Sequence, residues 1–178
     1  LTKRYTQNNE AYQLYLKGRF YWNKRNPDDL RRALEHFKQA IEKDPAYALA
    51  HAGLADAYIV LQNIGVMPTR EAYAKAKQAI DAALELDDSL AEAHTSLASF
   101  KEDQEWDWAG AEKEYKRAIE LNPGYATAHQ WYALFLDKLG RHEEAFAEIT
   151  RAVELDPLSL VMNRNLGQHF RYTRRYDE

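Results

Sequence analysis

Apolar residues recur with a helical period along most of the chain. In four segments, an alanine is followed four positions later by a large apolar residue, and three positions after that by a second alanine. This spacing places all three side chains on one face of a helix. Each segment therefore predicts a helix that packs closely on its neighbour, with small residues at the contact and one large side chain between them. The four sets are Ala33, Phe37 and Ala40; Ala76, Ile80 and Ala83; Ala111, Tyr115 and Ala118; and Ala145, Ile149 and Ala152.

A short turn follows each of these predicted helices. The turns contain Pro45, Asp88, Pro123 and Pro157, which are separated by 43, 35 and 34 residues. Proline ends one helix and starts the next. The whole pattern predicts nine helices, at residues 8–24, 28–43, 46–62, 69–86, 89–103, 108–121, 124–139, 142–155 and 158–174.

Two of the predicted helical hairpins carry inserted residues. The 43-residue spacing places an insertion in the second hairpin, at residues 63–68, which predicts longer helices or a projecting tip there. A smaller insertion lies at residues 23–26 of the first hairpin. Asn26 and Pro27 then form a good helix start, because asparagine caps the first turn and proline fits its first position.

The repeated segments resemble the tetratricopeptide repeat family. The fourth unit carries the family's 34-residue pattern at full length, and the first unit carries it more loosely. The resemblance implies an all-α fold, a right-handed superhelix (α-solenoid) of antiparallel helix hairpins. The residues that carry the pattern in the fourth unit are His129, Tyr132, Ala133, Leu136, Gly140, Ala145, Ile149, Ala152 and Pro157.

The resemblance covers residues 8–178 and divides them into units. We expect a single domain, 1–178, with repeats at about 8–45, 46–88, 89–123 and 124–157 and half a repeat at 158–178. The chain begins with Leu1 and stops where the second helix of the fifth hairpin should begin, so we expect it to be a fragment of a longer protein. We expect fraying or self-association at 158–178, because the missing helix would cover Leu160, Leu166 and Phe170.

In this family, the first helices of the hairpins line a concave groove that holds a peptide or a helix of a partner protein. Position along the first helices predicts a groove that is aromatic at one end, acidic in the middle and basic at the other, which suits a peptide with a basic centre. The family's carboxylate clamp is absent, because its slots hold Tyr15, Arg19, Gly53 and Glu92. The predicted groove residues are Tyr12, Tyr15, Arg19, Trp22, Asp56, Ile59, Ser99, Glu102, Asp103, Gln130, Leu134, Asp137, Arg164, Gln168 and Arg171.

Composition narrows the function. The net charge of −4 argues against nucleic-acid binding by this chain. The chain has no cysteine, so disulfides and cysteine-based metal sites are excluded, and the cytoplasm is the favoured compartment. Apolar runs fall far short of the roughly 18 residues of a membrane span. No phosphate-binding loop or nucleophile elbow occurs, so we expect neither a cofactor nor enzymatic activity.

Two sets of residues invite a sharper interpretation. His51, His94 and His129 occupy the same slot of three repeats, but equivalent helices lie roughly 10 Å apart, too far to share one metal ion, so we predict that they pack. Trp106 and Trp108 flank the start of a helix. We predict that both pack, one buried between repeats and one covering the second hairpin, while an exposed aromatic anchor for a partner is the alternative.

Two functional hypotheses remain. The first is a non-catalytic scaffold for protein–protein or peptide interaction. The second is the regulatory or sensory module of a bacterial signalling enzyme or winged-helix transcription regulator, because residues 11–22, 105–108 and 128–133 are similar to repeat regions of such regulators. Sequence upstream of Leu1 would separate the two hypotheses.

Overall fold

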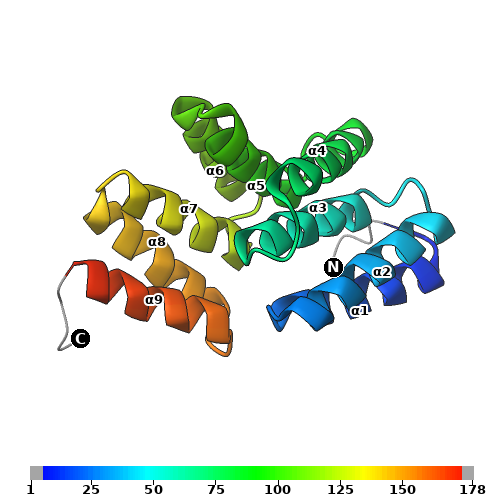
Figure 1. Ribbon diagram of the computed structural model, residues 1–178, viewed down its shortest axis with the longest axis horizontal. Coiled ribbons are helices and arrows are strands. Elements are labelled where there is room, and N and C mark those ends of the chain that lie inside the picture. The colour runs from blue at the N-terminus through cyan, green and yellow to red at the C-terminus, as the bar shows by residue number, and fades with distance from the viewer. Residues whose placement is uncertain (1–5, 174–178) are drawn as a thin grey trace.

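The computed structural model describes residues 6–173, and every regular element in that part of the chain is a helix (Figure 1). The predicted helices are confirmed, with small differences at their ends. They are α1 (Asn9–Asn23), α2 (Pro27–Lys43), α3 (Ala48–Asn63), α4 (Thr69–Leu86), α5 (Ala91–Phe100), the π-helix η1 (Lys101–Glu105), α6 (Trp108–Leu121), α7 (Ala126–Lys138), α8 (His142–Leu155) and α9 (Leu160–Tyr172).

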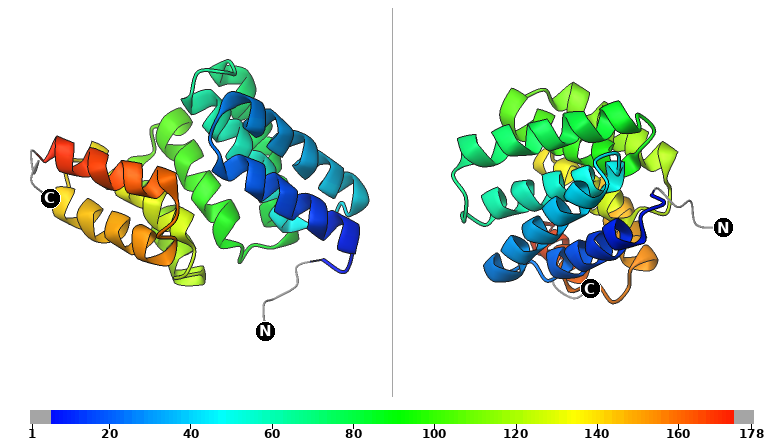
Figure 2. Two further views of the ribbon diagram at one scale, coloured as in Figure 1. Left: turned by 90° about the horizontal axis from the view of Figure 1, so that it is seen from below. Right: turned by 90° about the vertical axis from the view of Figure 1, so that its right-hand side faces the viewer.

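The helices pack as antiparallel hairpins in chain order, α1 with α2, α3 with α4, α5 with α6 and α7 with α8 (Figures 1 and 2). The second helix of each hairpin contacts the first helix of the next. The first helices α1, α3, α5, α7 and α9 also contact one another in that order, so they form a continuous inner layer. The result is the all-α superhelix of stacked hairpins that the sequence predicts. Within the described residues, no helix has both the length and the apolar character that a membrane crossing requires.

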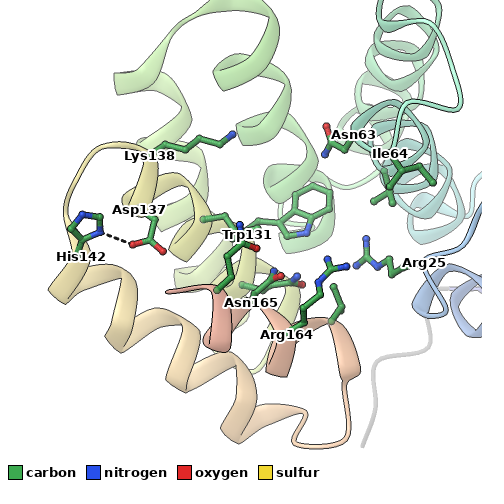
Figure 3. A pocket seen from close by; sticks show the side chains of 14 residues that line it. Arg25, Asn63, Ile64, Trp131, Asp137, Lys138, His142, Arg164 and Asn165 are labelled. Carbon is green, nitrogen blue, oxygen red and sulfur yellow. Dashed lines mark hydrogen bonds and ion pairs between the residues drawn. The ribbon is translucent and has the colours of Figure 1, made fainter. Parts of the chain in front are cut away.

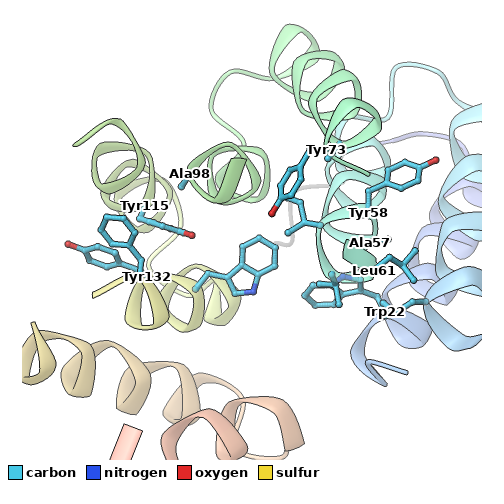
Figure 4. Packing of buried hydrophobic residues seen from close by; sticks show 14 of the residues in the cluster. Trp22, Ala57, Tyr58, Leu61, Tyr73, Ala98, Tyr115 and Tyr132 are labelled. Carbon is cyan, nitrogen blue, oxygen red and sulfur yellow. The ribbon is translucent and has the colours of Figure 1, made fainter. Parts of the chain in front are cut away.

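The predicted alanine contacts between helices are confirmed. All eight alanines of the repeated pattern are fully buried, and the large side chain between each pair is buried as well. Because alanine carries only a β-carbon, the second helix of each hairpin can approach its neighbours closely at these points. The core continues through larger side chains between repeats, where Tyr115 and Tyr132 lie side by side with ring centroids 5.6 Å apart (Figure 4).

Phe37 shows how tight this packing is. Its ring lies against two glycines, Gly18 of α1 and Gly53 of α3. A β-carbon at Gly53 would lie 2.6 Å from the Phe37 Cε1 atom, and one at Gly18 would lie 2.5 Å from the same atom. The two glycines therefore hold a buried ring between α1 and α3.

The first three turns between repeats share one hydrogen-bonding scheme. In each turn, the side chain of the residue just before Pro45, Asp88 or Pro123 accepts a hydrogen bond from the backbone N–H of the residue just after it. The Asp44 carboxylate accepts from Ala46, the Asp87 carboxylate from Ser89, and the Asn122 side chain from Gly124. This is an Asx turn, in which a short polar side chain imitates the backbone of a turn.

A second contact fixes the same turns. The Nε2 atom of His129 lies 3.1 Å from the carbonyl oxygen of Pro123, six residues earlier. His51 and His94 make the same contact with residues 45 and 88 of their own turns, and Asn163 donates to the carbonyl of residue 157 in the last turn. This position, histidine in three repeats and asparagine in the last, therefore ties the start of α3, α5, α7 and α9 to the turn before it.

The extra residues of the second and third repeats are accommodated differently. In the second hairpin, α3 and α4 run to 16 and 18 residues, which agrees with the predicted longer helices, and the loop at 64–68 that joins them packs Val66 and Met67 against the core. The third repeat is one residue longer than the fourth, and its first helix ends in the five-residue π-helix η1. A π-turn holds one more residue than an α-turn, so it absorbs the extra residue locally.

The last helix, α9, is less exposed than the sequence predicts. Leu160 is 88% exposed, in agreement with the prediction. Leu166 and Phe170, by contrast, are partly buried. Leu166 packs on the cluster around Met162, and the Phe170 ring lies 5.7 Å from that of Phe146. The rest of the predicted half repeat, 174–178, lies outside the described residues.

The contact between Phe37 and Gly53 predicts the effect of one methyl group. Gly53→Ala should lower the free energy of unfolding by about 1–3 kcal/mol, because the new β-carbon would lie 2.6 Å from the fully buried Phe37 ring. Gly167→Ala is the matched control, since nothing lies near a β-carbon at this helical position, and it should raise stability by about 0.5–1 kcal/mol. Urea unfolding measures both changes, and equal effects of the two substitutions would contradict the packing argument.

Candidate binding groove

The middle of the inner layer is held by a buried ionic cluster. The Arg19 guanidinium of α1 donates to the Asp56 carboxylate of α3 over 2.9 Å, and the Ser96 hydroxyl of α5 donates to the same carboxylate over 2.6 Å. Asp56 is fully buried. Burial raises the pKa of the Asp56 carboxyl, and the charge of Arg19 opposes that rise. The cluster therefore links the first helices of three successive repeats.

Two further acidic residues, Glu102 and Asp103, lie in the π-helix η1. The buried carboxylate of Glu102 accepts hydrogen bonds from Lys138 and from the Tyr115 hydroxyl. Asp103 accepts a 2.7 Å bond from the Tyr73 hydroxyl. Burial raises the pKa of the Glu102 carboxyl, while Lys138 opposes the rise. These contacts fix η1 against both the preceding and the following hairpin.

Asp137 is also engaged within the chain. Its carboxylate lies 2.8 Å from Nδ1 of His142 and 3.1 Å from Nδ1 of the buried His169. The four acids predicted to form the centre of the groove are thus all bonded to other side chains. The prediction of an acidic centre for a basic peptide gains no support from these contacts, because the carboxylates already bind side chains within the chain.

A groove of about 790 Å³ lies at another place on the inner layer. It is bounded by the end of α3, the inner faces of α7 and α9, and the tips of the first, second and fourth hairpins (Figure 3). Its lining mixes apolar side chains, amides and cations. The lining residues are Arg25, Val60, Asn63, Ile64, Gln130, Trp131, Leu134, Asp137, Lys138, His142, Val161, Arg164, Asn165 and Gln168.

Five of the fifteen predicted groove residues line this groove, and all five come from α7 and α9. They are Gln130, Leu134, Asp137, Arg164 and Gln168. Five others are buried in the core, away from it: Trp22, Asp56, Ile59, Ser99 and Glu102. The remaining five are partly or fully exposed elsewhere: Tyr12, Tyr15, Arg19, Asp103 and Arg171.

Nine lining residues were not predicted, and three of them, Arg25, Ile64 and His142, lie at hairpin tips rather than on first helices. Arg25 lies at the tip of the first hairpin and Ile64 at the tip of the second. The insertions at 23–26 and 63–68 were the only signal in the sequence for these tips. Their approach to α9 depends on the curvature of the superhelix, which no short sequence pattern encodes.

The tryptophan prediction is wrong for Trp106. Its side chain is 73% exposed, and its backbone adopts the left-handed conformation that ends the π-helix (φ 56°). Trp108 is 36% exposed and packs on Phe135, with ring centroids 5.8 Å apart. The Trp106 ring meets only the edge of the Trp108 ring among the aromatic contacts of the described residues, with centroids 6.5 Å apart.

The shared histidine slot has a structural role. Besides the turn contacts, His94 and His129 each pair through Nδ1 with a glutamate of the following helix, at 2.7 and 2.6 Å. No group of three or more metal-ligating side chains occurs among residues 6–173. These contacts account for the histidines as packing residues, as predicted.

Comparison with known proteins identifies the family. Two models of the tetratricopeptide repeat match the chain, one at residues 27–65 and one at 107–159. Together they cover just over half of it. The chain belongs to the tetratricopeptide repeat family.

Solved structures share the fold. A thermophilic tetratricopeptide repeat protein of Thermus thermophilus superposes with a TM-score of 0.68 at 20% identity, over 92% of this chain and 83% of that one. The MamA protein superposes with a TM-score of 0.51 at 21% identity, over 94% of this chain and 85% of that one. At these identities, the likeness concerns the fold alone.

One group of curated relatives is similar in sequence. The transcriptional regulator HilA of Salmonella typhimurium is 27% identical over 148 residues, and HilA of Salmonella typhi matches equally well. The match takes in 83% of this chain. The chain spans only 27% of the length of these regulators.

The ionic cluster predicts a large effect of removing one partner. Asp56→Ala should lower the free energy of unfolding by about 3–5 kcal/mol, because Arg19 is left largely buried without its carboxylate. The double variant with Arg19→Leu should be less destabilised than the single variant. Glu154→Ala, which breaks the exposed pair with Arg151, is the control and should change stability little. Guanidinium unfolding measures all three, and a small effect of Asp56→Ala would contradict the role of the cluster.

A link between the third and fourth hairpins predicts a pH dependence. The pKa of Glu112 is lowered to about 2, chiefly by its hydrogen bond with Lys116 and also by those with Arg141 and Tyr132. A carboxyl whose pKa is depressed by folding stabilises the protein above its unfolded pKa, and that stability is lost as pH falls toward the folded value.

Glu112→Gln should therefore destabilise the protein most above about pH 5, and the difference from the parent should vanish as pH falls toward about 2. Thermal unfolding across this range measures the difference. A destabilisation that is independent of pH would show that the carboxylate charge does not matter.

Proposed function

We propose that the chain is a non-catalytic interaction scaffold that binds an extended segment of a partner protein in the groove bounded by α3, α7 and α9. The observation that carries the proposal is Gln130. It is 2% exposed, it lines the groove, and its Oε1 atom has no hydrogen-bond partner within residues 6–173. A buried carbonyl without a donor is costly, and a backbone N–H of a bound segment would supply one once the Gln130 side chain turns toward the groove.

The form of the groove supports the same proposal. Its volume lies in the range of ligand-binding clefts, and its walls combine the Trp131, Leu134 and Val161 side chains with amides. The walls belong to the first, second, fourth and fifth repeats, and the buried cluster fixes the first of these relative to the second. A rigid surface of this kind loses little conformational entropy when it binds.

A second candidate function is the regulation of an effector domain in a longer protein. The similarity to HilA favours it, because the matched segment makes up about a quarter of that regulator. In this proposal, occupancy of the groove changes the activity of a domain outside this chain. A groove substitution such as Leu134→Arg, placed in the longer protein, should then alter the effector's output without altering the effector's own fold.

Site-specific photo-crosslinking tests the scaffold proposal. A photoreactive amino acid at Ile64, on the groove wall, should capture a partner polypeptide in lysate of the source organism. The same group at Lys38, exposed on the second helix of the first hairpin, is the matched control and should not capture that polypeptide. Equal capture at both positions, or none at Ile64, would contradict binding in the groove.

A further inference from the structure

The groove adjoins a second cavity of about 840 Å³, and two arginines lie where they meet. Arg25, Val161 and Arg164 line both cavities. We propose, on the basis of the scaffold function above, that this junction recognises an acidic side chain within the partner's extended segment, held between Arg25 and Arg164, with apolar residues of the segment packed on either side.

Arg25 has unused hydrogen-bonding capacity. Its guanidinium lies 3.4 Å from the centroid of the Trp22 ring, which fixes its plane, and its Nε is buried without a hydrogen-bond partner in the described chain. Burial, together with the nearby charges of Arg19 and Arg164, lowers the pKa of Arg25 to about 9. An anion at this point would offset both the cost of burying an unpaired charge and the repulsion between the cations.

Arg164 approaches from the other end of the superhelix. It is an exposed residue of α9, and its guanidinium and that of Arg25 extend toward each other across the groove (Figure 3). Within residues 6–173, neither arginine forms an ion pair. Guanidinium groups bind carboxylates through two parallel hydrogen bonds, so two of them facing one space favour an acidic side chain.

The other charged groups of the groove are already bonded to side chains of the protein. Lys138 pairs with Glu102, and Asp137 holds His142 and His169. The charge that the groove itself leaves available to a ligand is therefore positive and is concentrated at the two arginines, while the second cavity is also lined by Lys24, which pairs with Asp29, and by the carboxylate of Asp156. This is the reverse of the acidic centre that the sequence alone suggested.

Apolar surface flanks the arginines on both sides. On the side of the groove it is formed by Ile64 and Trp131. On the side of the second cavity it is formed by Phe20, Leu158 and Leu160, which are 60%, 88% and 88% exposed. Large apolar side chains gathered at one exposed place indicate an interaction surface. A free inorganic anion would leave these walls uncovered, so the arrangement favours an acidic residue within an apolar segment.

Synthetic peptides test the proposal directly. Seven-residue peptides with Leu and Phe on both sides of a central Glu, Gln or Lys would be acetylated and amidated, so that no terminal carboxylate contributes. Fluorescence anisotropy should show that the Glu peptides bind at least about tenfold more tightly than the Gln peptides, which corresponds to a charged hydrogen bond. Added salt should weaken the Glu peptides more than the Gln peptides.

Substitutions at the junction test whether the preference for Glu peptides arises there. Arg164→Gln should reduce the preference for Glu to about twofold or less by removing one charged bond, and Arg164→Glu should shift it toward Lys. Arg171→Gln is the matched control, because Arg171 is exposed on the same helix but does not line either cavity. Circular dichroism establishes that each variant keeps the helical fold.

The possible outcomes separate the two proposals. Equal binding of Glu and Gln peptides, or a Glu preference that survives Arg164→Gln, overturns the acidic-residue proposal alone. Failure of every peptide to bind overturns it together with groove binding of extended segments. Displacement of Glu peptides by millimolar inorganic phosphate, with no contribution from Leu and Phe, would show a small-anion site and overturn the choice of partner. Dimerisation that buries Phe20 and Leu160, detected by sedimentation, would overturn it in favour of a second copy of the chain.

Discussion

The close approach of helices at small residues is the constraint on which the rest of the structure depends. The eight alanines of the repeated pattern have no exposed surface, and two glycines enclose Phe37. The distance between neighbouring helices is set at these contacts, and small changes there accumulate along a stack of repeats. The accumulated curvature brings the first hairpin's tip toward α9, and this approach creates the groove.

The same curvature explains why the fold could be predicted and the groove only in part. Helices, turns and alanine contacts depend on residues a few positions apart, so periodicity and proline spacing are sufficient to locate them. Asp56 and Glu102 lie on the predicted face of their helices, but neighbouring helices close that face in this part of the superhelix. Arg25 poses the opposite problem, because a loop residue gives no sign in the sequence of which distant helix it will approach. Its left-handed backbone and its position against Trp22 become visible only when the hairpin is built.

The buried charges restrict how the first three hairpins can stack. Arg19, Asp56 and Ser96 come from three different hairpins, so the cluster forms only when all three are stacked. Desolvating charges is expensive, and an arrangement that lacks one partner is strongly disfavoured. The cluster thus admits one alignment of the three hairpins, and fixing register is the role for which buried ionic contacts are best attested.

The π-helix has a consequence for how such arrays change in length. In an α-helix, one additional residue rotates every later side chain by roughly 100°, which would move an entire inner face out of alignment. Here the additional residue is confined to η1, and the left-handed Trp106 restores the path of the chain before α6 begins. The later hairpins keep their contacts as though nothing had been inserted. A solenoid with this device can gain single residues in the middle of its sequence without the compensating substitutions that a continuous helix would demand.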